Sequence, residues 1–334
     1  MFLNERMKSK ELIYYEALSQ RSVLSEDERR KLERLRKGYA GEIGYDRMLD
    51  EAGHAGLLIY RDLWLRIGEA TLQIDSLIIG EHVMVVNEIK NYSGRYAVDG
   101  GRWLLKGRQI SEDPIAQASR TAGKLLRLKK FIPYHFTVDK RAVFVNPDFH
   151  LVSCSGESGQ FIVVRTLLTE YFRELGRMSV GKNAHDLTET IKAFVIDNPI
   201  ALPVIHPSLI WGGSYCFKCS RYELVKRRFS IICRNCGYVE TVERLVVRGM
   251  IDFSVLHHTV PMTKERLCKF IGGMAAERTI RALLKKYCVM TAASQKTYYV
   301  IKNYHLEKLL RTNHYDSKYE KDERFIWASG DADA

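Results

Sequence analysis

The stretch 73-QIDSLIIGEHVMVVNEIKNYSG-94 decides how the rest of the chain is interpreted. Two apolar runs flank Gly80-Glu81, a pattern that predicts a hairpin of buried strands with its turn at that dipeptide. Ionisable groups stand at both edges, with Asp75 in the first strand and Glu88 and Lys90 at the end of the second. Because charged side chains are rarely buried without a partner, this edge of the hairpin is a candidate site.

Strand geometry predicts which of these groups meet. A turn at Gly80-Glu81 pairs residues whose numbers sum to about 161 to 163, so Asp75 falls opposite residues 86 to 88. Side chains alternate along a strand, and Glu88 and Lys90 therefore share one face. Asp75 and Glu88 can then converge on one point.

The chemistry of this trio depends on that convergence. Two carboxylates in contact repel each other unless a cation lies between them, and hard oxygen ligands suit Mg²⁺ or Mn²⁺. A lysine beside the cation can stabilise negative charge on a phosphate, which predicts metal-assisted hydrolysis of a phosphodiester. A strand that ends in Glu-Ile-Lys can also carry an ordinary surface ion pair. A structure with Asp75 far from Glu88 would favour that alternative.

Helices are expected on the N-terminal side of the hairpin. Residues 5–37 are interpreted as mostly helical, and a helix that starts at Ser25 is expected to end near Gly53. Three glycines weaken this helix and are interpreted as points of close packing: Gly38, Gly41 and Gly44.

Further elements extend the hairpin into a domain. Strands are expected at "LLIYRDLWLRI", "RWLLKG", "RAVFVNPD" and "FIVVRT". A helix over 113–131 is expected to begin with Asp113-Pro114. Strands flanked by helices in this way predict an α/β (α+β) fold, with a mixed sheet covered by helices.

Four ordered segments carry a family resemblance. They are "GEIGYDRML", the quoted hairpin, "DPIAQASRTAGKLL" and "RAVFVNPD". Together they resemble the nuclease-related (NERD) domain of the PD-(D/E)xK, restriction-endonuclease-like superfamily, over about residues 36–150. An isoleucine precedes Asp75 where the superfamily's name has a proline.

The resemblance implies a role for each site residue. Asp75 and Glu88 would be metal ligands, and Lys90 would be the catalytic lysine. Glu42 matches the acidic residue that often completes such sites, and Gln117 matches a recurring polar position beside them. Glu42 can also be an ordinary solvated glutamate of a helix.

Four of the seven cysteines form two Cys-x₂-Cys pairs, separated by thirteen residues. They are Cys216, Cys219, Cys233 and Cys236. Four thiolates in two knuckles can close a tetrahedron around Zn²⁺, which predicts a structural zinc ribbon. The glycine after the last cysteine suits a tight knuckle turn, and "FSII" and "YVETVERL" are expected to be strands of the ribbon. Four reduced core cysteines would not explain the double spacing. A redox pair is disfavoured because two copies of the motif face each other across a short basic segment. The remaining three cysteines are interpreted as core thiols.

The C-terminal part resembles a winged helix-turn-helix. A helix is expected from Thr263, followed by a turn at Gly272-Gly273, a second helix near 275–287 and two short strands. The second helix would then enter a groove of DNA. Helical pairs of this kind also serve as docking modules for proteins.

Charge points to a polyanionic partner. The net charge is +12 and the pI about 9.3, a balance that suits nucleic acid, with DNA favoured, although it also serves solubility. The residues expected to contact nucleic acid are Arg221, Lys226, Arg227, Arg228, Arg278, Arg281, Lys285 and Lys286. The basic face of the ribbon can equally be a solvated surface on a folding staple.

Composition also predicts domain boundaries and location. The expected segments are an N-terminal helical segment at 1–35, a NERD nuclease-like domain at 36–175, a helix and linker at 176–210, a zinc ribbon at 211–248, a winged-helix-like domain at 249–310 and a charged tail at 311–334. The N-terminus becomes charged within a few residues, and the sequence shows no long apolar run. A cytoplasmic protein that binds no membrane is therefore expected.

These observations predict a metal-dependent nuclease that uses Mg²⁺ or Mn²⁺ for catalysis and Zn²⁺ for structure. A homodimer is one arrangement that would allow both strands of a duplex to be cut. The alternatives are a non-catalytic DNA-binding or regulatory protein that keeps the nuclease fold, and a scaffold that recruits proteins through its last module.

Overall fold

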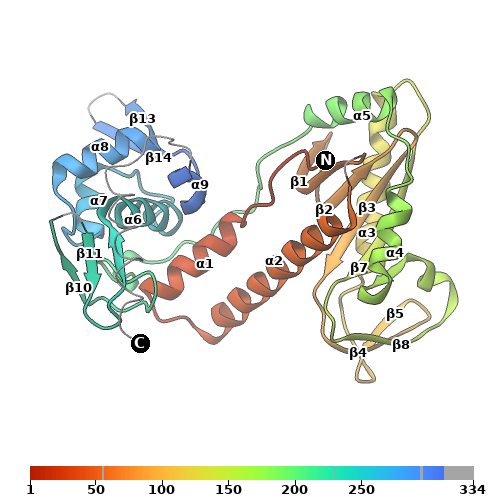
Figure 1. The fold of residues 1–334 in the computed structure, drawn as a ribbon, viewed down its shortest axis with the longest axis horizontal. Coiled ribbons are helices and arrows are strands. Elements are labelled where there is room, and N and C mark those ends of the chain that lie inside the picture. Colours follow the sequence, from red (N-terminus) through yellow and green to blue (C-terminus); the bar gives the residue numbers. More distant parts are fainter. Residues whose placement is uncertain (55, 229, 294–295, 312–334) are drawn as a thin grey trace, which may run out of the picture. The chain divides into compact units, whose positions relative to one another are not determined.

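The computed structural model describes residues 1–54, 56–228, 230–293 and 296–311 (Figure 1). The charged tail expected at 311–334 lies outside the described residues from 312 onward.

The chain divides into two compact units, which are described separately. The first unit comprises Met1–Met7 and Glu33–Pro199, and the second comprises Lys8–Leu32 and the residues from Ile200 on.

A five-stranded mixed sheet forms the centre of the first unit (Figure 1). Its strands lie in the order β1 (Leu58–Ile67), β2 (Ala70–Ile79), β3 (Val83–Lys90), β7 (Thr137–Phe144) and β9 (Ile162–Val164). The first three strands pair antiparallel, whereas β7 runs parallel to both β3 and β9. The predicted mixed α/β fold is confirmed.

Helices cover both faces of this sheet. One face packs against α3 (Pro114–Leu125), η1 (Leu126–Lys130) and α5 (Lys182–Lys192). The other packs against α2 (Glu26–Ala52) and α4 (Leu168–Leu175). α2 begins one residue after Ser25 and ends one before Gly53, as the sequence predicts. Ser25 and Glu28 form a reciprocal capping box at its start.

The first unit also contains a second sheet, of four strands, formed by residues that follow β3 in the sequence. Its order is β6 (Arg108–Gln109), β5 (Arg102–Leu105), β4 (Gly94–Asp99) and β8 (Phe149–Cys154). Tyr96, Trp103 and Phe149 of this sheet share a core with Phe144 of β7. Two short helices, η2 (Gly156–Phe161) and η3 (Arg165–Leu167), flank β9.

In β1 and β2, the alternation of side chains between the two faces of the sheet is interrupted once, at paired positions of the two strands. Tyr60 and Leu63 of β1 lie an odd number of residues apart, yet they face the same core, and the same holds for Ile74 and Leu77 of β2. Arg61 pairs with Ser76 and Leu63 pairs with Ile74, so Asp62 and Asp75 lie opposite each other between these pairs. Asp62 has a φ of 44°, and aspartate tolerates this left-handed conformation better than most residues. This interruption, or kink, therefore lies at Asp62 and at the predicted site residue Asp75 opposite it.

The N-terminal segment is extended, which makes the helical prediction wrong for residues 5–9. Leu3 N donates to Ile59 O at 2.8 Å, and Ile59 N donates to Met1 O at 3.1 Å, so the segment lies along β1. The Asn4 side chain accepts from Arg61 N at 2.8 Å. Arg6 is thereby carried into the interior of the first unit, where it is buried.

The second unit combines two small sheets with helices. Its strands are β10 (Leu224–Lys226), β11 (Ser230–Cys233), β12 (Val239–Thr241), β13 (Cys288–Ala293) and β14 (Lys296–Ile301). Its helices are α1 (Lys10–Arg21), η4 (Pro207–Leu209), α6 (Val242–Leu256), α7 (Lys264–Phe270), α8 (Glu277–Tyr287) and α9 (Leu306–Arg311). The succession of α7, α8 and the β13–β14 hairpin agrees with the expected elements, and the winged-helix identity stays a prediction.

Helix α6 is the main departure from the sequence prediction in this unit. The run "YVETVERL" was expected to be strand, but only Val239–Thr241 is, and α6 then begins at Val242. The Thr241 side chain accepts from Arg244 N at 3.1 Å and caps the helix. α6 continues to Leu256, across the expected domain boundary at residue 248.

α1 packs against α6 through a buried ion pair. Arg21 Nε lies 2.8 Å from Asp252 Oδ2, and Arg21 Nη1 donates to Gly213 O at 2.9 Å. The Tyr215 hydroxyl donates to the same Asp252 oxygen at 3.1 Å. The N-terminal helix is therefore part of the core of the second unit.

None of the helices in the described residues combines the length and the apolar character needed to cross a membrane.

Candidate active site and metal centre

The hairpin of β2 and β3 brings Asp75 and Glu88 together. Ser76 pairs with Asn87 and Leu77 with Val86, so the next pair in this register is Asp75 with Glu88. Ile89 N donates to Asp75 Oδ2 at 2.8 Å across the two strands. The pairing sums to 163, which confirms the register expected from a turn near Gly80-Glu81.

Lys90 lies between two predicted site residues. Its Nζ atom donates to Glu88 Oε1 at 2.7 Å and to Gln117 Oε1 at 3.2 Å. Gln117 is in the first turn of α3, which begins where the sequence predicts because the Asp113 side chain accepts from Ala116 N at 2.9 Å. Strand β3 and helix α3 thus meet at the lysine.

A glycine of α2 brings Glu42 towards this edge of the sheet. A Cβ at Gly41 would lie 2.5 Å from Asn91 Cβ, so only glycine permits this approach. Asn91 Nδ2 also donates to Lys37 O at 2.7 Å, which ties α2 to the end of β3. A Cβ at Gly38 or Gly44 would meet no described neighbour within 4 Å outside the helix itself. The close-packing interpretation is confirmed at Gly41 and wrong at the other two.

Arg6 is a site residue that the sequence did not indicate. Its Nη1 atom lies 2.8 Å from Glu42 Oε2, and its Nη2 atom donates to the backbone oxygen of Asp75 at 2.8 Å. Nε and Nη2 also bind the two oxygens of Asp46, at 2.7 and 3.1 Å. No motif surrounds Arg6, and only the extended N-terminal segment brings it here.

The five predicted residues, hereafter the carboxylate site, come from four elements. They are Glu42 of α2, Asp75 of β2, Glu88 and Lys90 of β3, and Gln117 of α3. Glu88 is buried, Asp75, Glu42 and Lys90 are half-buried, and Gln117 is exposed. Exposure within the site therefore increases from Glu88 to Gln117.

Electrostatics within the carboxylate site favour protons in the absence of a cation. Burial, together with the neighbouring Asp75 carboxylate, raises the pKa of Glu42 and that of Glu88 to about 8. Burial also raises the pKa of Asp75, against the charge of Lys90 and the hydrogen bond from Ile89. Burial lowers the pKa of Lys90, but its ion pair with Glu88 outweighs this and the net shift is upward. The carboxylates cannot all be charged without compensation.

The donor set fits a hard divalent cation. Asp75 and Glu88 are adjacent, and each engages one oxygen in the hydrogen bonds above, which leaves Asp75 Oδ1 and Glu88 Oε2 for a ligand. Mg²⁺ is commonly held by one or two carboxylates with water and substrate completing its shell. Glu42 is engaged by Arg6 instead.

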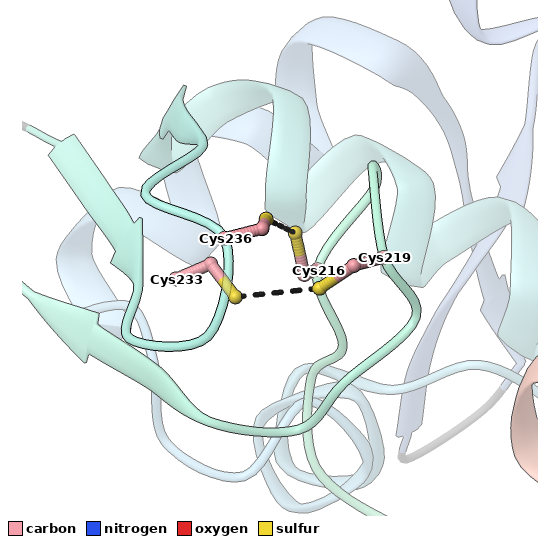
Figure 2. Close-up of side chains that lie close together, drawn as sticks. All are labelled: Cys216, Cys219, Cys233 and Cys236. Atoms are coloured by element: carbon pink, nitrogen blue, oxygen red, sulfur yellow. Dashed lines mark hydrogen bonds between the residues drawn. The ribbon is translucent and has the colours of Figure 1, made fainter.

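The four cysteines of the second unit form the cysteine site, which is a far tighter cluster (Figure 2). Their sulfur atoms all lie within 4.8 Å of one another, with 3.6 Å from Cys216 to Cys236 and 3.5 Å from Cys219 to Cys233. A tetrahedron with Zn–S bonds of about 2.3 Å needs about 3.8 Å between sulfurs. Within the described part of the chain, no other such group of His, Cys, Asp or Glu donors is found. The cluster is compatible with zinc.

Two similar knuckles build the cysteine site. Ser220 N donates to Cys216 O at 2.9 Å, and Gly237 N donates to Cys233 O at 3.0 Å. Both turn residues are left-handed, with φ of 62° at Ser220 and 71° at Gly237. Glycine adopts this conformation freely, as the sequence suggested for the second knuckle, whereas Ser220 does so without that advantage.

The predicted nucleic-acid contacts differ in exposure. Seven are exposed: Arg221, Lys226, Arg227, Arg228, Arg278, Arg281 and Lys285. Lys286 is only half-exposed, and its Nζ atom lies 2.8 Å from Glu243 Oε1 in the ion pair that joins α8 to α6. The structure therefore gives Lys286 an intramolecular role.

Comparison with known proteins agrees with the resemblance drawn from the sequence. The family model of the nuclease-related domain (NERD) matches residues 37–145, about a third of the chain. The match contains all five residues of the carboxylate site, but neither Arg6 nor the cysteine site. No curated protein and no solved structure matches the chain. The match supports a nuclease-related function for the first unit.

Proposed function

We propose that this protein is a metal-dependent nuclease that hydrolyses phosphodiester bonds in nucleic acid, with DNA as the favoured substrate. The observation that carries the proposal is the meeting of Asp75 of β2 with Glu88 and Lys90 at the C-terminal end of β3. Two adjacent carboxylates can hold a catalytic cation, and a lysine beside them can stabilise negative charge on a phosphate, so together they can support metal-assisted phosphodiester hydrolysis.

Asp75 and Glu88 are the residues that would hold Mg²⁺ or Mn²⁺. Such a cation, when bound, supplies positive charge that polarises a phosphate and makes water a stronger nucleophile. The hydrogen bond from Ile89 fixes the direction of the Asp75 carboxylate. The ion pair with Lys90 does the same for Glu88. The ligands are therefore oriented before any cation or substrate arrives.

Lys90 would act on the substrate itself. Its ammonium is held from two sides by Glu88 and Gln117, and the half-buried side chain leaves part of it open to solvent. An ammonium with three donors and two protein acceptors has one N–H left for a phosphate oxygen. Gln117 would be a positioning residue that aims Lys90 at the phosphate.

The second unit would retain the nucleic acid. Zn²⁺ in the cysteine site would hold the ribbon in shape, and the exposed arginines and lysines of the ribbon and of α8 would contact phosphates. A winged-helix role for α7, α8 and the β13–β14 hairpin fits this task. We place this activity in the cytoplasm, and a homodimer would allow both strands of a duplex to be cut.

A non-catalytic DNA-binding protein is the second candidate. It is favoured by the seven exposed basic residues of the second unit, which need no chemistry in the first. In that case the protein would keep the nuclease fold and its carboxylate site without catalysing a reaction.

Cleavage assays with Lys90→Ala separate the two candidates. Purified protein is incubated with plasmid, single-stranded DNA and RNA, with Mg²⁺, with Mn²⁺ or with EDTA. We expect cleavage only with a divalent cation, and a fall of about 10²-fold or more in Lys90→Ala because a charge-stabilising donor is lost. DNA binding should stay within about twofold, because most phosphate contacts lie elsewhere.

Lys192→Ala is the matched control. Lys192 is also an ion-paired lysine of the first unit, 2.5 Å from Glu189, but it is exposed on α5. Its loss should leave cleavage unchanged. Equal cleavage by Lys90→Ala and the wild type would remove Lys90 from the chemistry. An absence of cleavage on every substrate, with salt-sensitive binding retained, would favour the non-catalytic candidate.

A further inference from the structure

Arg6 lies outside the segment that matches the nuclease-related family, yet it contacts the carboxylate site directly. Its side chain is only 1% exposed. Burying a guanidinium in this way is costly unless the group is paired and its donors are satisfied. The contacts of Arg6 show what it is paired with.

Every nitrogen of the Arg6 guanidinium has a partner in the first unit. Nε and Nη2 hold the Asp46 carboxylate, Nη1 holds Glu42, and Nη2 also reaches the backbone oxygen of Asp75. The planar fork thus ties α2 to β2 at the level of the metal ligand. A lysine has no such fork and cannot reproduce these contacts.

The charges around Arg6 limit how many cations the site can take. The carboxylates of this region are Glu42, Asp46, Asp62, Asp75 and Glu88, and the basic groups that act on them are Arg6, Arg61 and Lys90. With all eight groups ionised, two negative charges are left. One divalent cation neutralises them, and a second would leave two positive charges.

The placement of Arg6 also removes a ligand that a second cation would use. Glu42 lies near enough to Asp75 and Glu88 for its charge to raise the pKa of Glu88. Its Oε2 atom, however, is 2.8 Å from Arg6 Nη1. The Arg6 guanidinium therefore occupies the carboxylate oxygen that Glu42 would otherwise offer to a second cation.

We propose that Arg6 is a positioning residue that takes the place of a second cation, so that the carboxylate site binds a single Mg²⁺ or Mn²⁺ at Asp75 and Glu88. The inference rests on the proposed function, because it assumes that a catalytic cation binds there. It also makes the N-terminal segment part of the site, although the segment lies outside the family match.

The test counts Mn²⁺ ions bound to the full, zinc-loaded chain, from the loss of the free Mn²⁺ signal in electron paramagnetic resonance. The wild type should bind one Mn²⁺, and Asp75→Asn should bind none. Glu42→Gln should still bind one with affinity within about threefold, because its partner is Arg6. Arg6→Gln should bind two, because Glu42 is released.

Two further variants separate positioning from simple stability. Arg6→Gln/Glu42→Gln should return to one Mn²⁺, because the released ligand is gone. Asp46→Asn breaks the other ion pair of the same arginine and is the matched control, with one Mn²⁺ expected. Zinc content and thermal denaturation show whether each variant is folded. If Arg6→Gln does not fold, the wild type and Glu42→Gln still decide the question.

The outcomes distinguish a failure of the role assigned to Arg6 from a failure of the proposed nuclease function. Two Mn²⁺ on the wild type, or loss of one on Glu42→Gln, would overturn the role of Arg6 and leave the nuclease proposal standing. One Mn²⁺ on a folded Arg6→Gln variant would also overturn it. No Mn²⁺ on the wild type would instead overturn the metal-dependent nuclease itself.

Discussion

The carboxylate site and the cysteine site are both candidate metal sites, and their residues are brought together in opposite ways. The cysteine site draws all four ligands from one short segment, and its sulfurs lie within 4.8 Å of one another. The carboxylate site draws its acids from α2, β2 and β3 and needs Arg6 and Lys90 to hold them. One site is local and closed, and the other is long-range and open.

Under the proposed function, this difference separates a structural role from a catalytic one. Four thiolates complete the shell of a zinc ion and leave no position for substrate. Two carboxylates leave most of the shell of a magnesium ion to water and phosphate. The cysteine site should therefore govern whether its unit folds, whereas the carboxylate site should govern chemistry at a cost in stability.

Loss of a zinc ligand should have the largest effect. Cys233→Ser should abolish zinc binding and unfold the ribbon, because structural zinc contributes about 10–16 kcal/mol in small domains, more than a typical domain's stability. Zinc content and thermal denaturation measure this. Cys268→Ser, a half-buried cysteine of α7 outside the cluster, is the control and should keep its zinc. Retention of one zinc and the wild-type melting curve by Cys233→Ser would contradict a structural metal.

The carboxylate site, in contrast, should lower the stability of the metal-free protein, because its carboxylates repel one another when they are charged. In the metal-free protein the pKa values of Glu42 and Glu88 are raised from 4.5 to about 8. The stability they contribute is fully present below pH 4.5 and is lost as the pH rises through 8. The melting temperature of zinc-loaded protein without Mg²⁺ should therefore fall progressively from about pH 5 to about pH 8.

Asp75→Asn isolates this effect from the titration of other groups. The Asp75 charge helps to raise both pKa values, so its removal should flatten the fall in melting temperature. Added Mg²⁺ should raise the melting temperature of the wild type most at high pH, where it competes with fewer protons, and should leave Asp75→Asn unchanged. Parallel profiles for the two proteins would show that the acids do not interact.

The two sites also differ in how far the sequence predicts them. The cysteine spacing, the caps at Asp113 and Ser25 and the register about Gly80-Glu81 are local signals, and each was confirmed because few residues intervene. The mixed sheet follows from the same alternation of strands and helices. Short-range geometry is therefore well specified by pattern alone.

The unpredicted features depend on distant contacts. Arg6 was assigned to a helix, because nothing in its neighbours shows that it would lie along β1. The kink at Asp62 requires a left-handed backbone conformation at this aspartate, and no turn motif in the sequence predicts it. The run "YVETVERL" after the last knuckle predicts a strand of the ribbon, whereas the cap at Thr241 and burial in the second unit favour helix from Val242 on.

Substitution of Gly41 should have the smallest effect on stability, and it tests directly how the carboxylate site is held together. Gly41→Ala would place a Cβ 2.5 Å from Asn91, so α2 must shift, and we expect a loss of about 1–3 kcal/mol in urea denaturation. Cleavage should fall as well, because Glu42 and its partner Arg6 move with the helix. Gly38→Ala is exposed, meets no described neighbour, and should stabilise α2 by about 0.5–1 kcal/mol without changing cleavage. If both variants gain stability, α2 does not depend on this contact, and the carboxylate site is held by its ion pairs alone.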